Sequence, residues 1–333
     1  MEINLDKIKC DDIVKILFAE NPGVVIQVAD KHKAEVKKIL EDAGVGYVKI
    51  GVPTEERHIL ATLHDATYQF GIDYLRDVWY STSYLLDRKQ SMNGCAKKRF
   101  ENYKQQPLEF VFDKSFTGKL SQFGLNPNRR TPSGIKAAII REKGTNGERE
   151  MAYMLYLAGF DVKDVTMTDL ISGRETLEDI NMVVYCGGFS NSDVLGSAKG
   201  WAGSFLFNPK AKAALDNFYA REDTLSLGVC NGCQLMMELG LITPEDKKKG
   251  KMLHNDSHKF ESNFLGVTVP MNRSVMFGSL SGSKLGIWVA HGEGKFSLPY
   301  PEDHYNVVLK YSYDEYPGNP NGSDYSVAGI ASQ

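Results

Sequence analysis

The pattern of apolar and polar positions predicts a small α/β segment at the start of the chain. The apolar run GVVIQVAD is typical of a buried strand, and the residues after it repeat apolar positions at helical spacing as far as Gly44. Four elements are expected, namely strand, helix, strand and a long helix, over residues 23–30, 31–44, 45–52 and 54–90.

The periodicity is lost between residues 93 and 132, where Gly, Pro, Asn and Lys interrupt the chain. NPNRRTPSG, residues 126–134, has the composition of an exposed connector. We therefore expect a first portion over residues 1–110, a linker over residues 111–134 and a second domain over residues 135–333.

Strands alternate with helices in this second domain. The expected strands are residues 135–140, 161–167, 180–188 and 224–229, and the expected helices are residues 146–160, residues 210–220 and a helix after Cys230. Such alternation predicts a mostly parallel sheet flanked by helices. Ligands of such sheets bind beyond the carboxyl ends of the strands, where Cys186-Gly187-Gly188 and Cys230 both fall.

Composition and charge exclude several classes of protein. An apolar content of 42% and a charged content of 24% are ordinary for a globular domain, and a net charge of −3 gives no general attraction to nucleic acid or to an anionic membrane. The start, MEINLDKIKCDDI, is too acidic for a secretory signal, and no apolar run approaches the roughly 18 residues of a membrane span. The 5 cysteines are mostly scattered, which favours reduced thiols. We expect a cytoplasmic protein with no nucleic-acid or membrane partner.

The C-x-x-C at Cys230 and Cys233 permits three interpretations. A structural zinc site needs four Cys or His ligands, usually as two spaced pairs, and the sequence holds no second C-x-x-C, so no metal is expected. A redox dithiol also begins a helix after a strand, so the local context leaves it open. The third interpretation is one reactive cysteine beside an inert one.

The glycines around Cys230 favour the third interpretation. Gly228 and Gly232 flank it at minus two and plus two, the pattern of a nucleophile elbow, in which a Cβ on either side would collide with its neighbours. A dithiol does not require these glycines. We predict that Cys230 is a nucleophile whose pKa is lowered by the helix N-terminus, and that Cys233 is a small helix residue. A buried structural cysteine in a glycine-rich turn is the alternative.

An oxyanion hole is expected beside this nucleophile. The amide of Asn231, directly after Cys230, points to where an oxyanion would form. The segment CGGFSNSD follows a neighbouring strand, and its glycines can turn a second amide, that of Gly188, into the same space.

The chain resembles a known family in these and other segments. The matching segments are GVCNGCQ, GGFSNSDVLGSAKGWA, REKGTNGEREMA, HNDSHKFESNFLGV and WVAHGEGKF. They resemble the class I, or triad-type, glutamine amidotransferase domain of phosphoribosylformylglycinamidine synthases in their large single-chain form. LRDVWYSTSYLLDRKQSMNGCA, residues 75–96, resembles the end of the ATP-dependent synthase portion of that family. The resemblance covers nearly the whole chain.

The resemblance implies a flavodoxin-like domain that hydrolyses glutamine through a cysteine thioester. The ammonia passes to a separate ATP-dependent site, which converts formylglycinamide ribonucleotide to formylglycinamidine ribonucleotide in purine biosynthesis. Cys230 would be the nucleophile, the Gly188 and Asn231 amides the oxyanion hole, and Gly187 and Gln234 substrate-binding residues. Its partners would be glutamine and the remainder of the synthase polypeptide. No cofactor is expected in this chain, because ATP and Mg²⁺ belong to the absent synthase portion.

The sequence departs from the family at the proton-accepting group. The family takes a histidine and its orienting carboxylate from an H-x-E within P-H-P-E-R near the C-terminus, and no such segment occurs here. We expect a fragment cut at both ends, with that pair outside it. The only H-x-E of the sequence is His291-Gly292-Glu293, which is the alternative base and orienter. Two other function classes stay open: a different α/β cysteine hydrolase that uses Cys230, His291 and Glu293, and a non-catalytic docking or regulatory domain.

Overall fold

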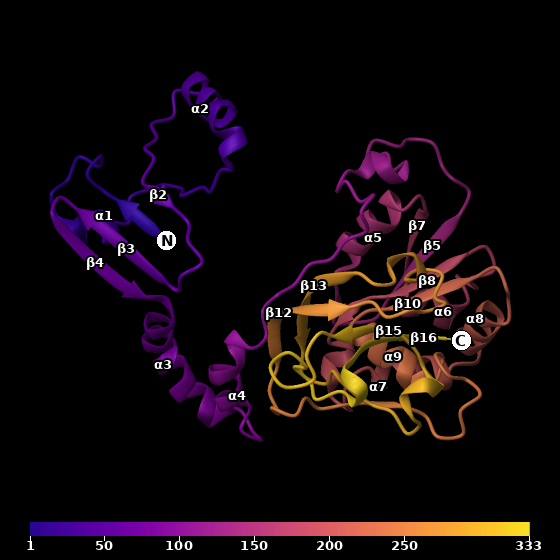
Figure 1. The fold of residues 1–333 in the computed structure, drawn as a ribbon. Helices are drawn as coiled ribbons and strands as arrows, with labels where there is room; N and C mark the ends of the chain where they lie inside the picture. The colour runs from indigo at the N-terminus through magenta and orange to yellow at the C-terminus, as the bar shows by residue number, and fades with distance from the viewer. Residues whose placement is uncertain (333) are drawn as a thin grey trace. The chain divides into compact units, whose positions relative to one another are not determined.

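The computed structural model describes residues 1–332, which form two compact units (Figure 1). The boundary between them falls between Leu86 and Asp87, well before the expected boundary at residue 110. Residues from Asp87 onward belong to the second unit. The assignment of the first part of the chain to a synthase portion stays a prediction. No helix among residues 1–332 is both long and apolar enough to cross a membrane.

The first unit is a four-stranded sheet in the order β2-β1-β3-β4 with short helices. Its strands are β1 (Glu2–Asn4), β2 (Gly51–Val52), β3 (His58–Leu63) and β4 (Ala66–Gly71), and its helices are α1 (Ile13–Phe18), α2 (Lys33–Asp42) and α3 (Ile72–Gln90), which crosses the unit boundary. Its small core gathers around Leu5, Ala61 and Leu63.

The structure departs from three of the predictions for this unit. The long helix expected from residue 54 begins only at Ile72, because residues 58–71 form the antiparallel hairpin β3–β4. Strand alternation decides this segment, since Ala61 and Leu63 are buried while Thr62 between them is not. The strand expected at residues 23–30 does not form, and Val24 is 87% exposed, so no neighbouring strand covers that apolar run. Only the last two residues of the other expected strand are extended, in β2.

The second unit contains the predicted parallel sheet, in the order β10-β8-β5-β7. Each neighbouring pair is parallel. The strands are β5 (Lys136–Arg141), β7 (Asp161–Thr166), β8 (Met182–Tyr185) and β10 (Leu225–Gly228), and the helices are α5 (Glu148–Leu157), α6 (Met167–Ser172), α7 (Lys199–Leu206), α8 (Pro209–Tyr219) and α9 (Asn231–Leu239). The prediction of an α/β domain with a parallel sheet flanked by helices is confirmed.

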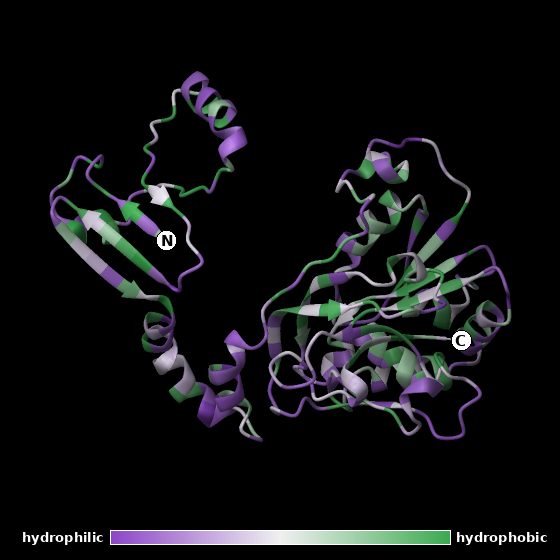
Figure 2. Cartoon of the chain, in the orientation of Figure 1, coloured by the Kyte–Doolittle hydropathy of each residue, from purple (hydrophilic) through white to green (hydrophobic). Residues whose placement is uncertain are grey.

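Alternation along the strands gives this sheet two apolar faces. In β5, Ala138 and Ile140 join one core cluster with α6, α7, α8 and α9, whereas Ala137 and Ile139 join another that includes Leu155 of α5. In Figure 2, β5 and β8 are coloured mainly as hydrophobic, whereas α2 of the first unit is coloured mainly as hydrophilic.

An antiparallel sheet, which the sequence pattern did not predict, packs beside α9. Its strands are β12 (Glu261–Thr268), β13 (Lys284–His291), β15 (Asn306–Tyr311) and β16 (Val327–Ala331), in the order β13-β12-β15-β16, and a ribbon of β11 (Lys251–Leu253) and β14 (Lys295–Ser297) lies beside it. Met237 of α9 shares a core cluster with Phe296 of β14 and Val327 of β16. This packing brings the end of β13 to the start of α9.

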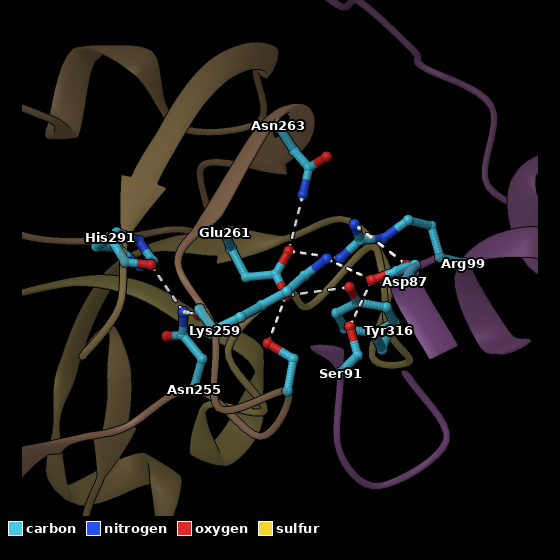
Figure 3. A network of polar contacts seen from close by, with 10 residues as sticks. Asp87, Ser91, Arg99, Asn255, Lys259, Glu261, Asn263, His291 and Tyr316 are labelled. Atoms are coloured by element: carbon cyan, nitrogen blue, oxygen red, sulfur yellow. Dashed lines mark hydrogen bonds and ion pairs between the residues drawn. The ribbon is translucent and has the colours of Figure 1, made fainter. Parts of the chain in front are cut away.

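A buried ionic network explains the position of the unit boundary (Figure 3). Glu261, at the start of β12, is 1% exposed and accepts hydrogen bonds from Arg99 of α4 (Cys95–Glu101) at 2.7 Å and from the Tyr316 hydroxyl at 3.0 Å. Lys259 donates to Asp87 at 2.5 Å, and Arg99 lies 3.6 Å from the same carboxylate. These contacts hold the segment after Leu86 against the antiparallel sheet.

We predict that Arg99→Met lowers the free energy of unfolding of the second unit by about 3–5 kcal/mol, because it leaves the buried Glu261 without its cation. Urea unfolding measures this, followed by tryptophan fluorescence, to which the buried Trp201 contributes. The matched control is Arg141→Met, which removes a more exposed pair with Asp164 and is expected to cost about 0–1 kcal/mol. Equal effects of the two substitutions would contradict the role given to the network.

Candidate active site

Cys230 lies at a sharp turn between strand β10 and helix α9. Its backbone has φ 55° and ψ −112°, a conformation that non-glycine residues rarely adopt. A Cβ on Gly228 would lie 2.5 Å from the carbonyl oxygen of Gly232, and a Cβ on Gly232 would overlap the carbonyl oxygen of Tyr185 in β8. Both flanking positions therefore require glycine, and the sharp strand–helix turn expected from the sequence is present, while the role of Cys230 as nucleophile stays a prediction.

Two backbone amides converge on the sulfur of Cys230. They belong to Asn231, the first residue of α9, and to Gly188, and both donate toward Sγ. Gly188 belongs to β9 (Gly187–Gly188), which pairs with β6 (Thr145–Asn146) and has Gly188 at φ 117°. A Cβ on Gly188 would lie 2.5 Å from the carbonyl oxygen of Gly144, so this close pairing requires glycine. The two donors expected for an oxyanion hole lie together.

The pKa of the Cys230 thiol is raised above its ordinary value of 9.0, mainly by burial. The Asn231 and Gly188 amides act against this shift, and the negative charge of Asp193 adds to it. The expectation that the helix N-terminus leaves this cysteine with a lowered pKa is therefore wrong, because desolvation outweighs both amides. In the resting structure the thiol donates to the carbonyl oxygen of Ala290 in β13, with 3.5 Å between Sγ and oxygen.

Cys233 is part of the core and not of the site. It packs in the cluster that joins α9 to β14 and β16, and burial raises its pKa to about 12. Both Cys230 and Cys233 are free thiols. A thiol this difficult to ionise is poorly suited to dithiol exchange, so the geometry favours one reactive cysteine over a redox pair.

A pocket of about 200 Å³ opens beside Cys230. Of the predicted site residues, its wall contains Gly188, Cys230, Gln234, His291 and Glu293. The remaining two adjoin it. Asn231 is fully buried at the start of α9, and Gly187 lies so close that a Cβ on it would be 3.3 Å from the Cβ of Cys230.

Gln234 fastens α9 to the wall of the pocket. Its Nε2 donates to the carbonyl oxygen of Glu293 at 2.7 Å, and its Oε1 accepts from Nδ2 of Asn231 at 2.9 Å. The Oδ1 of Asn231 in turn accepts from the amide of Ser190 at 3.1 Å. Both ends of the Gln234 amide are thus engaged within the protein, and its role in seating a substrate stays a prediction.

His291 and Glu293 are both in the pocket, but they are not paired. The ring of His291 lies against Gly294, its Nδ1 is buried without a hydrogen-bond partner, and burial lowers its pKa to about 4. The carboxylate of Glu293 instead lies 4.0 Å from Nδ1 of His254. Within residues 1–332, the hydrogen bond given by Cys230 Sγ runs to Ala290 and not to a histidine. Their roles as base and orienter stay a prediction.

Sequence reasoning missed two residues of this site. Asn255, fully buried, donates from Nδ2 to the carbonyl oxygen of His291 at 2.7 Å and accepts from the amide of Gly294 at 3.0 Å (Figure 3). Asp193 lines the pocket from the turn after β9. Both lie inside the quoted family segments, but neither belongs to an α-helix or a strand whose periodicity would mark it.

The described residues place no group of three or more His, Cys, Asp or Glu side chains to hold a metal ion. His254 and His258 stack on each other, with 6.0 Å between ring centroids.

Comparison with known proteins identifies similar chains. A family model for a CobB/CobQ-like glutamine amidotransferase domain matches residues 134–333. Phosphoribosylformylglycinamidine synthases of Drosophila melanogaster and Homo sapiens are 35% and 36% identical over 95% and 96% of this chain, which spans only 25% and 26% of their lengths. The solved structure of PurLQS from Thermotoga maritima is 28% identical, covers 60% of this chain and 82% of its own, and has a TM-score of 0.47. The family model and the two curated synthases confirm the resemblance found in the motifs.

We predict that iodoacetamide alkylates Cys230 and spares Cys233, and that the rate at Cys230 rises with pH up to and beyond pH 9. The thiolate is the reacting form, so below a raised pKa the rate grows by about tenfold per pH unit. Mass mapping of peptides after brief treatment at several pH values measures both. A rate at Cys230 that is flat above pH 7, or labelling of Cys233 first, would contradict the account of the thiol.

Proposed function

Because the chain belongs to the family of CobB/CobQ-like glutamine amidotransferase domains, we propose that it binds glutamine and releases ammonia from the side-chain amide. The observation that carries this proposal is the convergence of the Gly188 and Asn231 amides on the sulfur of Cys230. Two fixed donors beside a nucleophile suit a reaction that develops negative charge on a carbonyl oxygen.

The proposed reaction has two covalent stages. The Cys230 sulfur attacks the amide carbon, and the oxygen of the tetrahedral intermediate accepts hydrogen bonds from the Gly188 and Asn231 amides. The C–N bond then breaks, ammonia leaves with the proton that the thiol gave up, and a thioester remains. Water hydrolyses the thioester to glutamate and restores the thiol. Gly187 and Gln234, next to Cys230, support substrate binding by shaping the wall around it.

We further propose that the chain is the glutaminase part of a phosphoribosylformylglycinamidine synthase. The relatives that carry this name are about four times as long, since the chain spans 25% and 26% of them. The released ammonia would be used by the remainder of the synthase polypeptide to make formylglycinamidine ribonucleotide, with ATP and Mg²⁺ bound there. Composition and charge favour the cytoplasm as its compartment.

The reaction also needs a base that accepts the proton of the Cys230 thiol. His291, with Glu293 as its orienting carboxylate, is the alternative candidate for this base. A pKa of about 4 makes His291 a weak base, and the Glu293 carboxylate faces His254. We propose that His291 supports the pocket wall and that the base is another group. The two other classes, a different cysteine hydrolase and a docking domain, lack an observation that favours them.

We predict that glutamine labelled in its carbon chain leaves an acid-stable label on the protein, and that Cys230→Ala abolishes it. The thioester survives acid quenching, so filter binding after brief mixing detects it. Cys10→Ala, in the first unit, is the matched control and is expected to keep the full signal. Label retained by Cys230→Ala would refute the proposed nucleophile.

We also predict that His291→Ala keeps more adduct formation than Cys230→Ala does. Loss of the general base of a catalytic triad costs several powers of ten, whereas loss of a wall residue costs far less. The readout is the initial rate of adduct formation together with glutamate release. A loss with His291→Ala as complete as that with Cys230→Ala, repeated by Glu293→Gln, would instead make these two residues the base and orienter.

A further inference from the structure

Asp193 is a charged residue of the pocket wall that has no part in the proposed reaction. Its Oδ1 is buried and has no hydrogen-bond partner, and Oδ2 accepts a long hydrogen bond from the Ser197 hydroxyl at 3.4 Å. The Ala198 amide and the Asn231 side chain also act on the carboxylate. A buried oxygen of a carboxylate without a partner is costly, so such groups usually face a ligand or take part in function.

The backbone that presents Asp193 is strained. Asn191, Ser192 and Asp193 have φ values of 51°, 56° and 50°, in a region that side-chain-bearing residues rarely adopt. The turn is held in place because the amide of Asn191 donates to the carbonyl oxygen of Lys143 at 2.7 Å. Consecutive strained residues persist only where the surroundings fix them, and here they direct a carboxylate into the pocket.

Asp193 lies within electrostatic reach of the reacting sulfur and of a second carboxylate. The charge of Asp193 raises the pKa of Cys230. The pKa of Asp193 is itself raised, mainly by burial and also by the charge of Glu293, while the Ala198 amide and the Asn231 side chain act to lower it. The two carboxylates therefore repel each other across the pocket. A cation between them would relieve this repulsion.

The basic residues of the pocket wall have neighbours other than Asp193. Lys259 is paired with Asp87 at 2.5 Å, and His254 lies 4.0 Å from Glu293. His258 stacks on His254. None of the ion pairs among residues 1–332 includes Asp193.

We propose that Asp193 binds the α-ammonium group of the amino-acid substrate, with Glu293 on the other side of the same group. This inference rests on the proposed function, because glutamine carries its reactive amide at one end of a short chain and its ammonium at the other. With the amide carbonyl at Gly188 and Asn231, the ammonium would fill the negative end of the pocket. Asp193 thereby selects an amino acid over a simple amide.

The test compares two chloroketones that alkylate Cys230, the glutamine-like reagent with its α-amino group and the same reagent without it. The unsubstituted protein is expected to react faster with the amino reagent. Asp193→Asn is expected to lower this preference by about tenfold or more, since hydrogen bonds to charged groups are the stronger ones. Asp193→Glu, which keeps the charge, is expected to restore part of it.

Iodoacetamide, which has no ammonium group, distinguishes a loss of ammonium binding from a general disruption of the site. Because the charge of Asp193 raises the pKa of Cys230, its removal should leave the iodoacetamide rate unchanged or higher. Opposite effects on the two kinds of reagent exclude a merely structural role. The control is Asp216→Asn on α8, an exposed residue paired with Lys212, which should change none of the rates.

The outcomes are distinguishable. An Asp193→Asn protein that keeps the full preference for the amino reagent would overturn the inference while leaving the nucleophile in place. A parallel fall in all three rates would also overturn it, by making Asp193 a structural residue. Failure of both chloroketones to react at Cys230 in the unsubstituted protein would overturn the proposed function and this inference with it.

Discussion

The site depends on a steric constraint, the absence of side chains where α9 meets strand β8. Gly232 approaches the carbonyl oxygen of Tyr185 so closely that a Cβ would overlap it, and Gly228 faces Gly232 in the same way. This close packing lets the chain reverse within two residues and holds Cys230 in a conformation that its own side chain disfavours. The sulfur is thus fixed at the carboxyl edge of the sheet, where the first amide of α9 and the amide of Gly188 reach it.

The wall opposite the elbow depends on buried polar contacts. Asn255 holds the turn after β13 by bonding both the carbonyl oxygen of His291 and the amide of Gly294, and Gln234 bonds the carbonyl oxygen of Glu293 between them. A few residues further on, Glu261 anchors the segment that carries Arg99. The loop that lines the pocket therefore adjoins the ionic network that fastens the start of the unit.

The sequence predicted those features that local sterics and periodicity determine. The cores of β5 and β8 are short apolar runs between helices, and the elbow is visible directly in the spacing of its glycines. The pattern failed where tertiary pairing decides the structure. The apolar residues of β3 and β4 fit either a helix or a hairpin, and the hairpin forms because each strand finds a partner, whereas residues 23–30 have none. The thiol pKa could not be predicted, since burial is a property of the folded chain. Asp193 could not be found either, because its strained turn has no composition signal.

The central claim is that the amides of Gly188 and Asn231 stabilise negative charge on an oxygen bound through Cys230. A crystal structure of the adduct with a glutamine-like chloroketone tests it most directly, because the ketone oxygen of that adduct takes the place of the oxyanion. The account predicts that the reagent is attached to the sulfur of Cys230 and that its ketone oxygen lies about 2.7–3.1 Å from both amide nitrogens. An adduct on Cys233, or one on Cys230 whose oxygen points to solvent and away from both amides, would contradict it.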